Sequence, residues 1–160
     1  MFNLAQPTPP KPMPPDFEDL DFAIQNEEWN EYELKDGAVV RGRVFLTRIA
    51  RDPYDPKNMA FEFSNPVWSV RAPASMRGQP DPTQLGQPVS GEKYEVHINR
   101  NHEPWNVYRI IKTGQKLKIK LTVNEVSRYV DKFDAKGMPL YNVPSGVAVN
   151  LSEPEPNKGQ

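Results

Sequence analysis

Alternation of apolar and polar residues is the dominant pattern in this chain, and it predicts β-strands. Apolar side chains or glycine occupy every second position from residue 40 to 46 and again from 117 to 123, which is the period of a strand with one buried face. Asp36-Gly37 follows an apolar-alternating segment and predicts a hairpin turn, because these residues tolerate the positive φ of a tight turn. The strands predicted around this turn are 29–35, 38–51, 59–63 and 67–71.

The alternating pattern and the residues before it occur twice in the chain. The segment Trp29–Tyr32 (WNEY) recurs at Trp105–Tyr108 (WNVY), and the two alternating rows that follow align without a change of face. At the far end of the copies, Val149 aligns with Val70. A slip of one residue would move every side chain to the other face of a strand, so the preserved alternation is stronger evidence for a duplication than the identities alone.

The duplication predicts an all-β protein, a barrel or a sandwich, built from two pseudo-symmetric repeats that each contain a hairpin. Two separate domains of this length would be too small to bury an adequate core, so we expect one fused domain. An additional strand is predicted over 93–99, and residues 22–25 are its only candidate counterpart. The predicted boundaries are an arm at 1–28, a β domain at 29–152 (repeat one 29–73, connection 74–104, repeat two 105–152) and a tail at 153–160.

The arm combines two kinds of sequence. Six of the first fifteen residues are proline, and proline fixes φ and lacks a backbone N–H, so this part is predicted to be extended. The acidic segment that follows carries interleaved apolar residues. We expect these to contact a protein partner, a sister subunit or the rest of the chain; they are Phe17, Leu20, Phe22 and Ile24.

The repeat resembles a group of short, uncharacterised prokaryotic β proteins. Their shared features are a W-N-x-Y-x-L-x-D-G-x-V opening, which begins here at Trp29, and a later D-x-x-G-x-P-x-Y segment. The second feature matches Asp134, Gly137, Pro139 and Tyr141. The resemblance implies a β fold, here in two tandem copies, and it implies no activity.

Composition narrows the functional classes. The chain contains no cysteine, which excludes disulfides, cysteine-liganded zinc and a cysteine nucleophile. No apolar run reaches the roughly 18 residues that span a bilayer, and the beginning of the chain lacks the features of a secretory signal. We therefore expect a cytoplasmic protein that does not insert into a membrane.

Charge is unevenly distributed along the chain. Residues 1–37 contain two lysines against nine acidic residues, a net charge of −7, whereas residues 38–160 contain 18 basic and 12 acidic residues, a net charge of +6. Such asymmetry indicates pairing within the molecule or an anionic partner.

Basic residues are concentrated on the outward face of the predicted strands. These residues are Arg41, Arg43, Lys116, Lys118 and Lys120. They could bind an anion or a nucleic acid. They could instead form a plain solvated face, or be neutralised by the acidic segment Asp16–Glu33.

The sequence offers no catalytic constellation and predicts no cofactor. Neither His97 nor His102 has partners at metal-ligand spacing. Asp55 and Asp134 recur between strands, where aspartate usually bonds its own backbone in a turn. Trp29 and Trp105 are predicted to start strands and to enter the core, although together with Tyr108 they could line a small-molecule site between the halves.

These observations predict a non-catalytic structural or adaptor subunit. Its arm and its proline-rich loop over 72–91 would contact a protein partner or a second copy of the chain. The alternative is an oligonucleotide-binding β-barrel that uses the outward basic residues.

Overall fold

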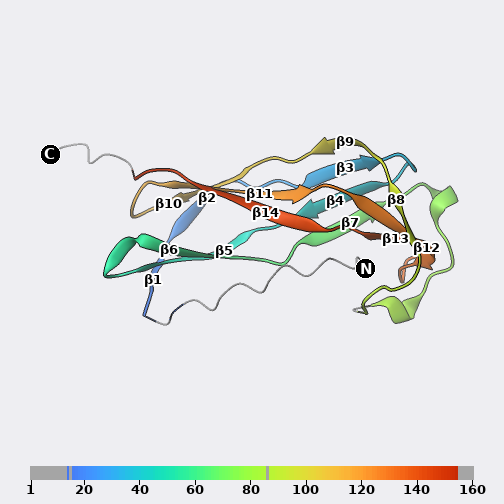
Figure 1. Cartoon of the computed structure of the whole chain (residues 1–160), viewed down its shortest axis with the longest axis horizontal. Helices are drawn as coiled ribbons and strands as arrows, with labels where there is room; N and C mark the ends of the chain where they lie inside the picture. The colour runs from blue at the N-terminus through green and yellow to red at the C-terminus, as the bar shows by residue number, and fades with distance from the viewer. Residues whose placement is uncertain (1–13, 15, 86, 155–160) are drawn as a thin grey trace.

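The computed structural model describes residue 14 and residues 16–85 and 87–154 (Figure 1). The proline-rich part of the predicted arm and most of the predicted tail lie outside the described residues. The structure is all-β. Its elements are β1 (Glu18–Leu20), β2 (Phe22–Asn26), β3 (Asn30–Leu34), β4 (Val39–Arg43), β5 (Leu46–Asp52), β6 (Asp55–Phe63), β7 (Val67–Arg71), the 3-10 helices η1 (Ala74–Met76) and η2 (Pro82–Gln84), β8 (Lys93–Val96), β9 (Ile98–His102), β10 (Asn106–Ile110), β11 (Lys116–Val123), β12 (Val126–Phe133), β13 (Pro139–Asn142) and β14 (Ser145–Leu151).

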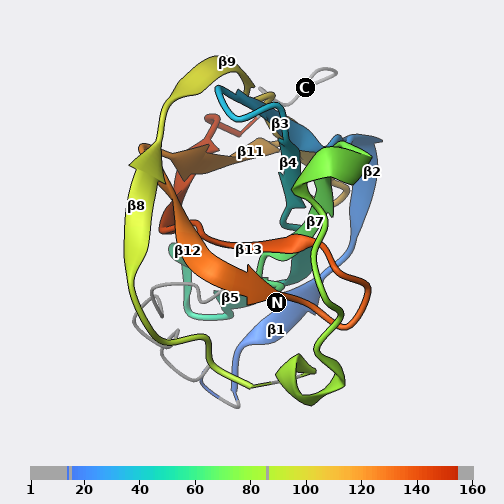
Figure 2. The same cartoon turned by 90° about the vertical axis from the view of Figure 1, so that its right-hand side faces the viewer.

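The strands form four antiparallel sheets. Their orders are β1-β5-β6, β7-β4-β3-β9, β13-β12-β8 and β14-β11-β10-β2. The long strand predicted over 38–51 divides at Val44 and Phe45 into β4 and β5, which belong to different sheets. The strand predicted over 93–99 likewise divides into β8 and β9. Viewed end-on, these bent strands surround the long axis of the molecule (Figure 2).

The predicted duplication is confirmed by the pairing register. Strands β1–β7 form one unit and β8–β14 form a second unit with the same pairing order. Tyr32 lies opposite Val40 in the first unit, as Tyr108 lies opposite Leu117 in the second. The two copies also include the strands before the tryptophans, so residues 18–26, predicted to be part of the arm, form β1 and β2.

The end of the predicted alignment was wrong by two residues. Trp68 lies opposite Gly42, and Val149 lies opposite Ile119. Because Ile119 is the counterpart of Gly42, the counterpart of Val149 is Trp68 and not Val70. The error equals one period of a strand, so it leaves the assignment of faces intact.

The two units exchange strands. β2 of unit one pairs with β10 of unit two, whereas β9 of unit two pairs with β3 of unit one. β1 and β8 remain in their own units, where they pair with β5 and β12. Two segments, 18–26 and 93–102, therefore each pair with both units. One four-stranded sheet of each unit gains its last strand from the other unit.

The hydrophobic core is also shared between the two units. The first cluster surrounds Tyr32 and includes Val126 of unit two, and the second surrounds Tyr108 and includes Ile49 of unit one. Both tyrosine side chains are fully buried. Burial of apolar surface contributes roughly 25 cal/mol per Å², and much of that surface is shared between units.

The long connection after β7 packs on the same molecule. Gly78 N–H donates to the carbonyl oxygen of Gly137 in the β12–β13 turn at 2.9 Å. The ring of Phe133 lies over Gly78, so an added Cβ at this glycine would meet Phe133 Cε2 at 2.4 Å. Val89, near the end of the connection, is buried with Tyr129. The connection is therefore anchored to unit two at both ends.

The two units differ in packing at Gly42, whose counterpart is Ile119. The Trp68 ring crosses it, and a Cβ built on Gly42 would lie 2.3 Å from Cζ3 of Trp68. Gly42→Ala is expected to lower the free energy of unfolding by about 1–3 kcal/mol through overpacking. Urea denaturation measures this change.

The second unit suggests the matched control, because it places Ile119 opposite a valine. Gly42→Ala should cost less stability in a Trp68→Val background than in the natural protein. If Gly42→Ala lowers stability equally in both backgrounds, the Trp68 ring is not the reason that this position needs a glycine.

Candidate binding surface

The recurring Trp-Asn-x-Tyr segments join the two units by hydrogen bonds. Asn30 Nδ2 donates to the carbonyl oxygen of Leu121 at 2.7 Å, and Asn106 Nδ2 donates to that of Val44 at 3.0 Å. Leu121 and Val44 are counterparts in the two units. Both asparagines are buried, so each amide supplies a partner to a backbone group at the centre of the molecule.

The tyrosines of these segments form a second exchanged pair of bonds. Tyr32 Oη donates to Glu103 Oε2 and Tyr108 Oη donates to Glu27 Oε2, both at 2.7 Å. Burial raises the pKa of both phenols well above the usual value, and the adjacent carboxylates raise it further. A phenol that stays protonated remains a hydrogen-bond donor, so these contacts persist at physiological pH.

Glu27 and Glu31 neutralise the arginine row, defined as Arg41 and Arg43. Arg43 Nη2 lies 2.6 Å from Glu27 Oε1, and Arg41 Nε lies 3.2 Å from Glu31 Oε1. Both guanidinium groups also lie over the ring of Trp29, at 4.8 and 5.3 Å from its centroid. Carboxylates of the acidic segment Asp16–Glu33 thus reach the basic face of unit one, which is one of the alternatives expected from the sequence.

The corresponding lysine row, defined as Lys116, Lys118 and Lys120, has a different environment. Lys116 and Lys118 are exposed and Lys120 is half-buried. Arg109 lies opposite Lys116 on β10 and adds a fourth cation to this face. Within the part of the chain that the structure describes, no carboxylate lies at ion-pair distance from these four residues.

The rest of this face is mostly neutral. Asn150 and Ala148 of β14 lie opposite Lys118 and Lys120. Trp105 is 37% exposed, and Lys120 Nζ lies 5.2 Å from its ring centroid. The carboxylate of Glu28 accepts a hydrogen bond from Asn26 Nδ2, which also donates to the carbonyl oxygen of Trp105. An exposed aromatic ring on a cationic face offers a stacking surface for a planar ligand.

The prediction that both tryptophans enter the core was wrong. Trp29 is half-buried beneath the arginine row, and Trp105 is partly exposed beside Lys120. Tyr108, by contrast, is fully buried. These three side chains therefore do not line a common small-molecule site.

The apolar residues of the acidic segment are divided between core and surface. Leu20 is buried in the second cluster, and Phe22 packs against that cluster with its ring 5.7 Å from that of Tyr108. Phe17 is half-buried, whereas Ile24 is 61% exposed. Of the four residues predicted to contact a partner, Ile24 offers the largest exposed fraction.

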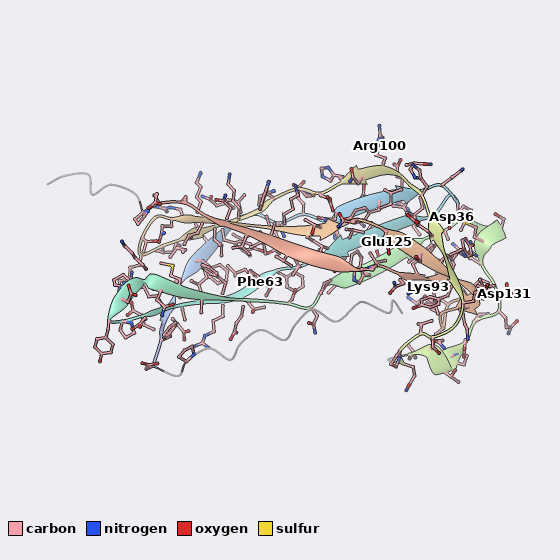
Figure 3. The ribbon with its side chains drawn as sticks, viewed as in Figure 1. Asp36, Phe63, Lys93, Arg100, Glu125 and Asp131 are labelled. Carbon is pink, nitrogen blue, oxygen red and sulfur yellow. The ribbon has the colours of Figure 1, made fainter. Side chains whose placement is uncertain are left out.

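One polar cluster was missed from the sequence. Tyr141 Oη donates to Asp36 Oδ2 at 2.7 Å, and Arg128 Nη1 lies 3.7 Å from the same oxygen. Burial, followed by the Asp36 carboxylate, raises the pKa of Tyr141. Asp36 belongs to the hairpin turn of unit one, and Figure 3 shows it near the end of the molecule that carries Lys93. The cluster ties that turn to unit two.

The recurring aspartates Asp55 and Asp134 both accept hydrogen bonds from their own backbone segment. Asp134 Oδ1 accepts the backbone N–H groups of Lys136 and Met138 at 2.8 and 2.9 Å. Asp55 accepts that of Lys57 at 3.3 Å. The expected bonds to the backbone are confirmed for both residues; Asp134 lies in the β12–β13 turn, and Asp55 is the first residue of β6, directly after a turn.

Comparisons with protein-family models, curated proteins and solved structures found no match. Residues 16–85 and 87–154 contain no group of three side chains suited to hold a metal ion. In the same ranges, no helix has the length and apolar character needed to cross a membrane.

The buried tyrosines predict a loss of stability at alkaline pH. Unfolded tyrosine titrates near pH 10, whereas the folded phenols keep their protons to higher pH. The stability they contribute is complete below about pH 10 and is lost as pH rises towards their folded pKa values. The decline should reach about 1.4 kcal/mol per tyrosine per pH unit, and urea unfolding at a series of pH values measures it.

Tyr141→Phe should make this alkaline decline shallower while lowering stability at neutral pH, because Asp36 loses a hydrogen bond. Tyr54→Phe is the control, since that side chain is 89% exposed. If the free energy of unfolding of Tyr141→Phe falls with alkaline pH as steeply as that of the natural protein, the Tyr141 phenol does not contribute to the decline.

Proposed function

We propose that this protein is a non-catalytic binding protein whose lysine row holds a single-stranded nucleic acid. One observation carries the proposal: counterpart rows of the two units differ in their neutralisation. Arg41 and Arg43 each have a carboxylate at ion-pair distance. Among the described residues, the lysine row has no such carboxylate, so its charge is available to an external anion.

The shape of the row favours a linear polyanion. Residues two apart on a strand are separated by roughly 6.8 Å, so the three ammonium groups of β11 follow a line instead of converging on one point. Arg109 extends the cationic surface to the neighbouring strand. Each phosphate contact releases bound counterions, which makes such binding favourable and strongly dependent on salt.

Trp105 favours a single strand over a duplex. Its ring is partly exposed beside Lys120, and an exposed indole stacks on bases regardless of their identity. The faces of bases are accessible in a single strand and are covered by their neighbours in a duplex. The expected binding is therefore tolerant of sequence.

A structural or adaptor role is the second candidate. The observation that favours it is the outer edge of β14, where Val147, Val149 and Leu151 are between 37% and 45% exposed. The arm and the 72–91 connection are the other contact segments expected for this role from the sequence. The two roles are compatible because they use different parts of the same sheet.

The triple variant Lys116→Gln, Lys118→Gln, Lys120→Gln is expected to bind nucleic acid more weakly and with less dependence on salt. The slope of log K against log salt should fall by about 2, since each lost contact to a single strand removes about 0.7. Fluorescence anisotropy with a labelled oligothymidylate over a series of salt concentrations measures both quantities.

The matched control replaces the exposed lysines Lys57, Lys132 and Lys136 by glutamine, which changes net charge equally. This control should retain the natural slope. Absence of binding by the natural protein at low salt, or equal effects of the two triple variants, would contradict the proposed surface.

A further inference from the structure

β14 is an edge strand without the usual protection. It spans seven residues, none of them charged, and among the described residues it has a partner strand, β11, on one side only. Figure 1 shows it crossing the middle of the molecule in red-orange. Edge strands commonly carry charges or proline, because their unpaired backbone groups otherwise recruit another strand.

The register identifies which backbone groups of β14 face outward. Ser152 N–H donates to the carbonyl oxygen of Lys116 at 2.9 Å, and the pairing continues from there without a shift. Hydrogen-bonded positions alternate along an antiparallel strand. Asn150, Ala148 and Gly146 therefore bond to β11. The outward groups belong to Ser145, Val147, Val149 and Leu151.

The residues whose backbone groups point away from β11 also have partly exposed side chains. Val147, Val149 and Leu151 are 38%, 45% and 37% exposed, although their neighbours on β11, Leu121, Ile119 and Leu117, are buried. The strand thus presents unpaired backbone groups and an apolar row along one edge.

The counterpart strand of unit one is protected. In the register established above, Val147 corresponds to Pro66, which has no N–H to offer, and Val149 corresponds to Trp68, which lies over Gly42. β7 also ends in Arg71. The edge strand β9 carries Arg100, whose side chain points away from the body of the molecule in Figure 3.

We propose that β14 pairs antiparallel with β14 of a second copy of this chain, around a two-fold axis at Ala148. Ala148 is the midpoint of β14, so this register pairs the strand with its own full length. It places Val147 opposite Val149 of the second copy, and Ser145 opposite Leu151. Because the same apolar row faces itself, the edge is self-complementary, as a two-fold interface requires.

The alternative occupants fit less well. Residues 1–15 contain six prolines, and each removes a donor that strand addition needs. Repulsion between the two lysine rows does not oppose pairing. Strands lie about 4.8 Å apart, so the two copies of β11 would be separated by roughly 14 Å, which exceeds the Debye length of about 8 Å at physiological salt.

This inference deepens the structural role named as the second candidate, and it does not depend on nucleic-acid binding. Two four-stranded sheets would join into one, with both lysine rows on the same face. A longer polyanion could then cross two copies, which raises its effective affinity through multivalency.

A single introduced cysteine tests the register directly, because the natural chain has none. At non-hydrogen-bonded positions the Cα atoms of facing residues lie about 4.5 Å apart, within the range of a disulfide. Under mild oxidation, Ala148→Cys should form a covalent dimer on a non-reducing gel. Val67→Cys places the cysteine at the counterpart position of β7 and should remain monomeric.

Light scattering tests the assembly without a crosslink. The natural protein should have twice the 18.3 kDa mass of the chain, and Val147→Pro, which removes an outward N–H, should have the mass of the chain. Val149→Lys should act likewise, while Val67→Lys, at an equally exposed valine (45%), should leave the dimer intact. Circular dichroism verifies that each variant is folded.

A natural protein with the mass of one chain at all concentrations overturns the proposal. So does a Val67 variant that crosslinks or dissociates in the same way as its β14 counterpart. The lysine triple variant should still dimerise, so failure of nucleic-acid binding and failure of dimerisation are distinguished.

Discussion

Hydrogen bonds that cross between the two units, at Asn30 and Asn106, determine how the rest of the molecule is assembled. Each amide bonds a backbone carbonyl group of the other unit in a buried setting, where an unpaired carbonyl would cost about 1–3 kcal/mol. The exchanged strands β2 and β9 bring Glu27 and Glu103 to the tyrosines of the opposite unit. Since sheets, core and polar contacts are all shared, neither unit can bury its hairpin without the other.

The same architecture leaves the two units with different surfaces. In unit one, a glycine admits the ring of Trp68, a proline interrupts the edge, and Glu27 neutralises Arg43. In unit two, the counterpart positions hold Ile119, Val147 and Lys120. The residues that cover the edge and neutralise the face of unit one therefore have no equivalent in unit two. A duplicated fold of this kind can keep one unit for stability and adapt the other for binding.

The two proposals concern adjacent parts of one sheet. The lysine row lies on the outward face of β11, and the proposed dimer edge belongs to β14, its neighbour. Pairing of two edges would extend the basic face, and a polyanion bound across both copies would stabilise that pairing by mass action. Binding and assembly would then reinforce each other, although each rests on different residues: charged side chains in one case, and backbone groups and valines in the other.

The sequence alone determined the alternating segments of the two repeats, the duplication and the face to which most of their side chains belong, because alternation and turn chemistry act over a few residues. It also indicated residues 22–25 as a counterpart of the additional strand. It did not reveal the exchange of β2 and β9, the Asp36–Tyr141 contact, or the surface positions of Trp29 and Trp105. The exchange brings Tyr32 to Glu103, 71 positions away, and the Asp36–Tyr141 contact joins residues 105 positions apart. The two tryptophans contact cations that are closer in the chain, Arg41 and Lys120. Period-2 alternation assigns a side chain to a face, and only the tertiary structure decides whether that face meets a carboxylate, a ring or solvent.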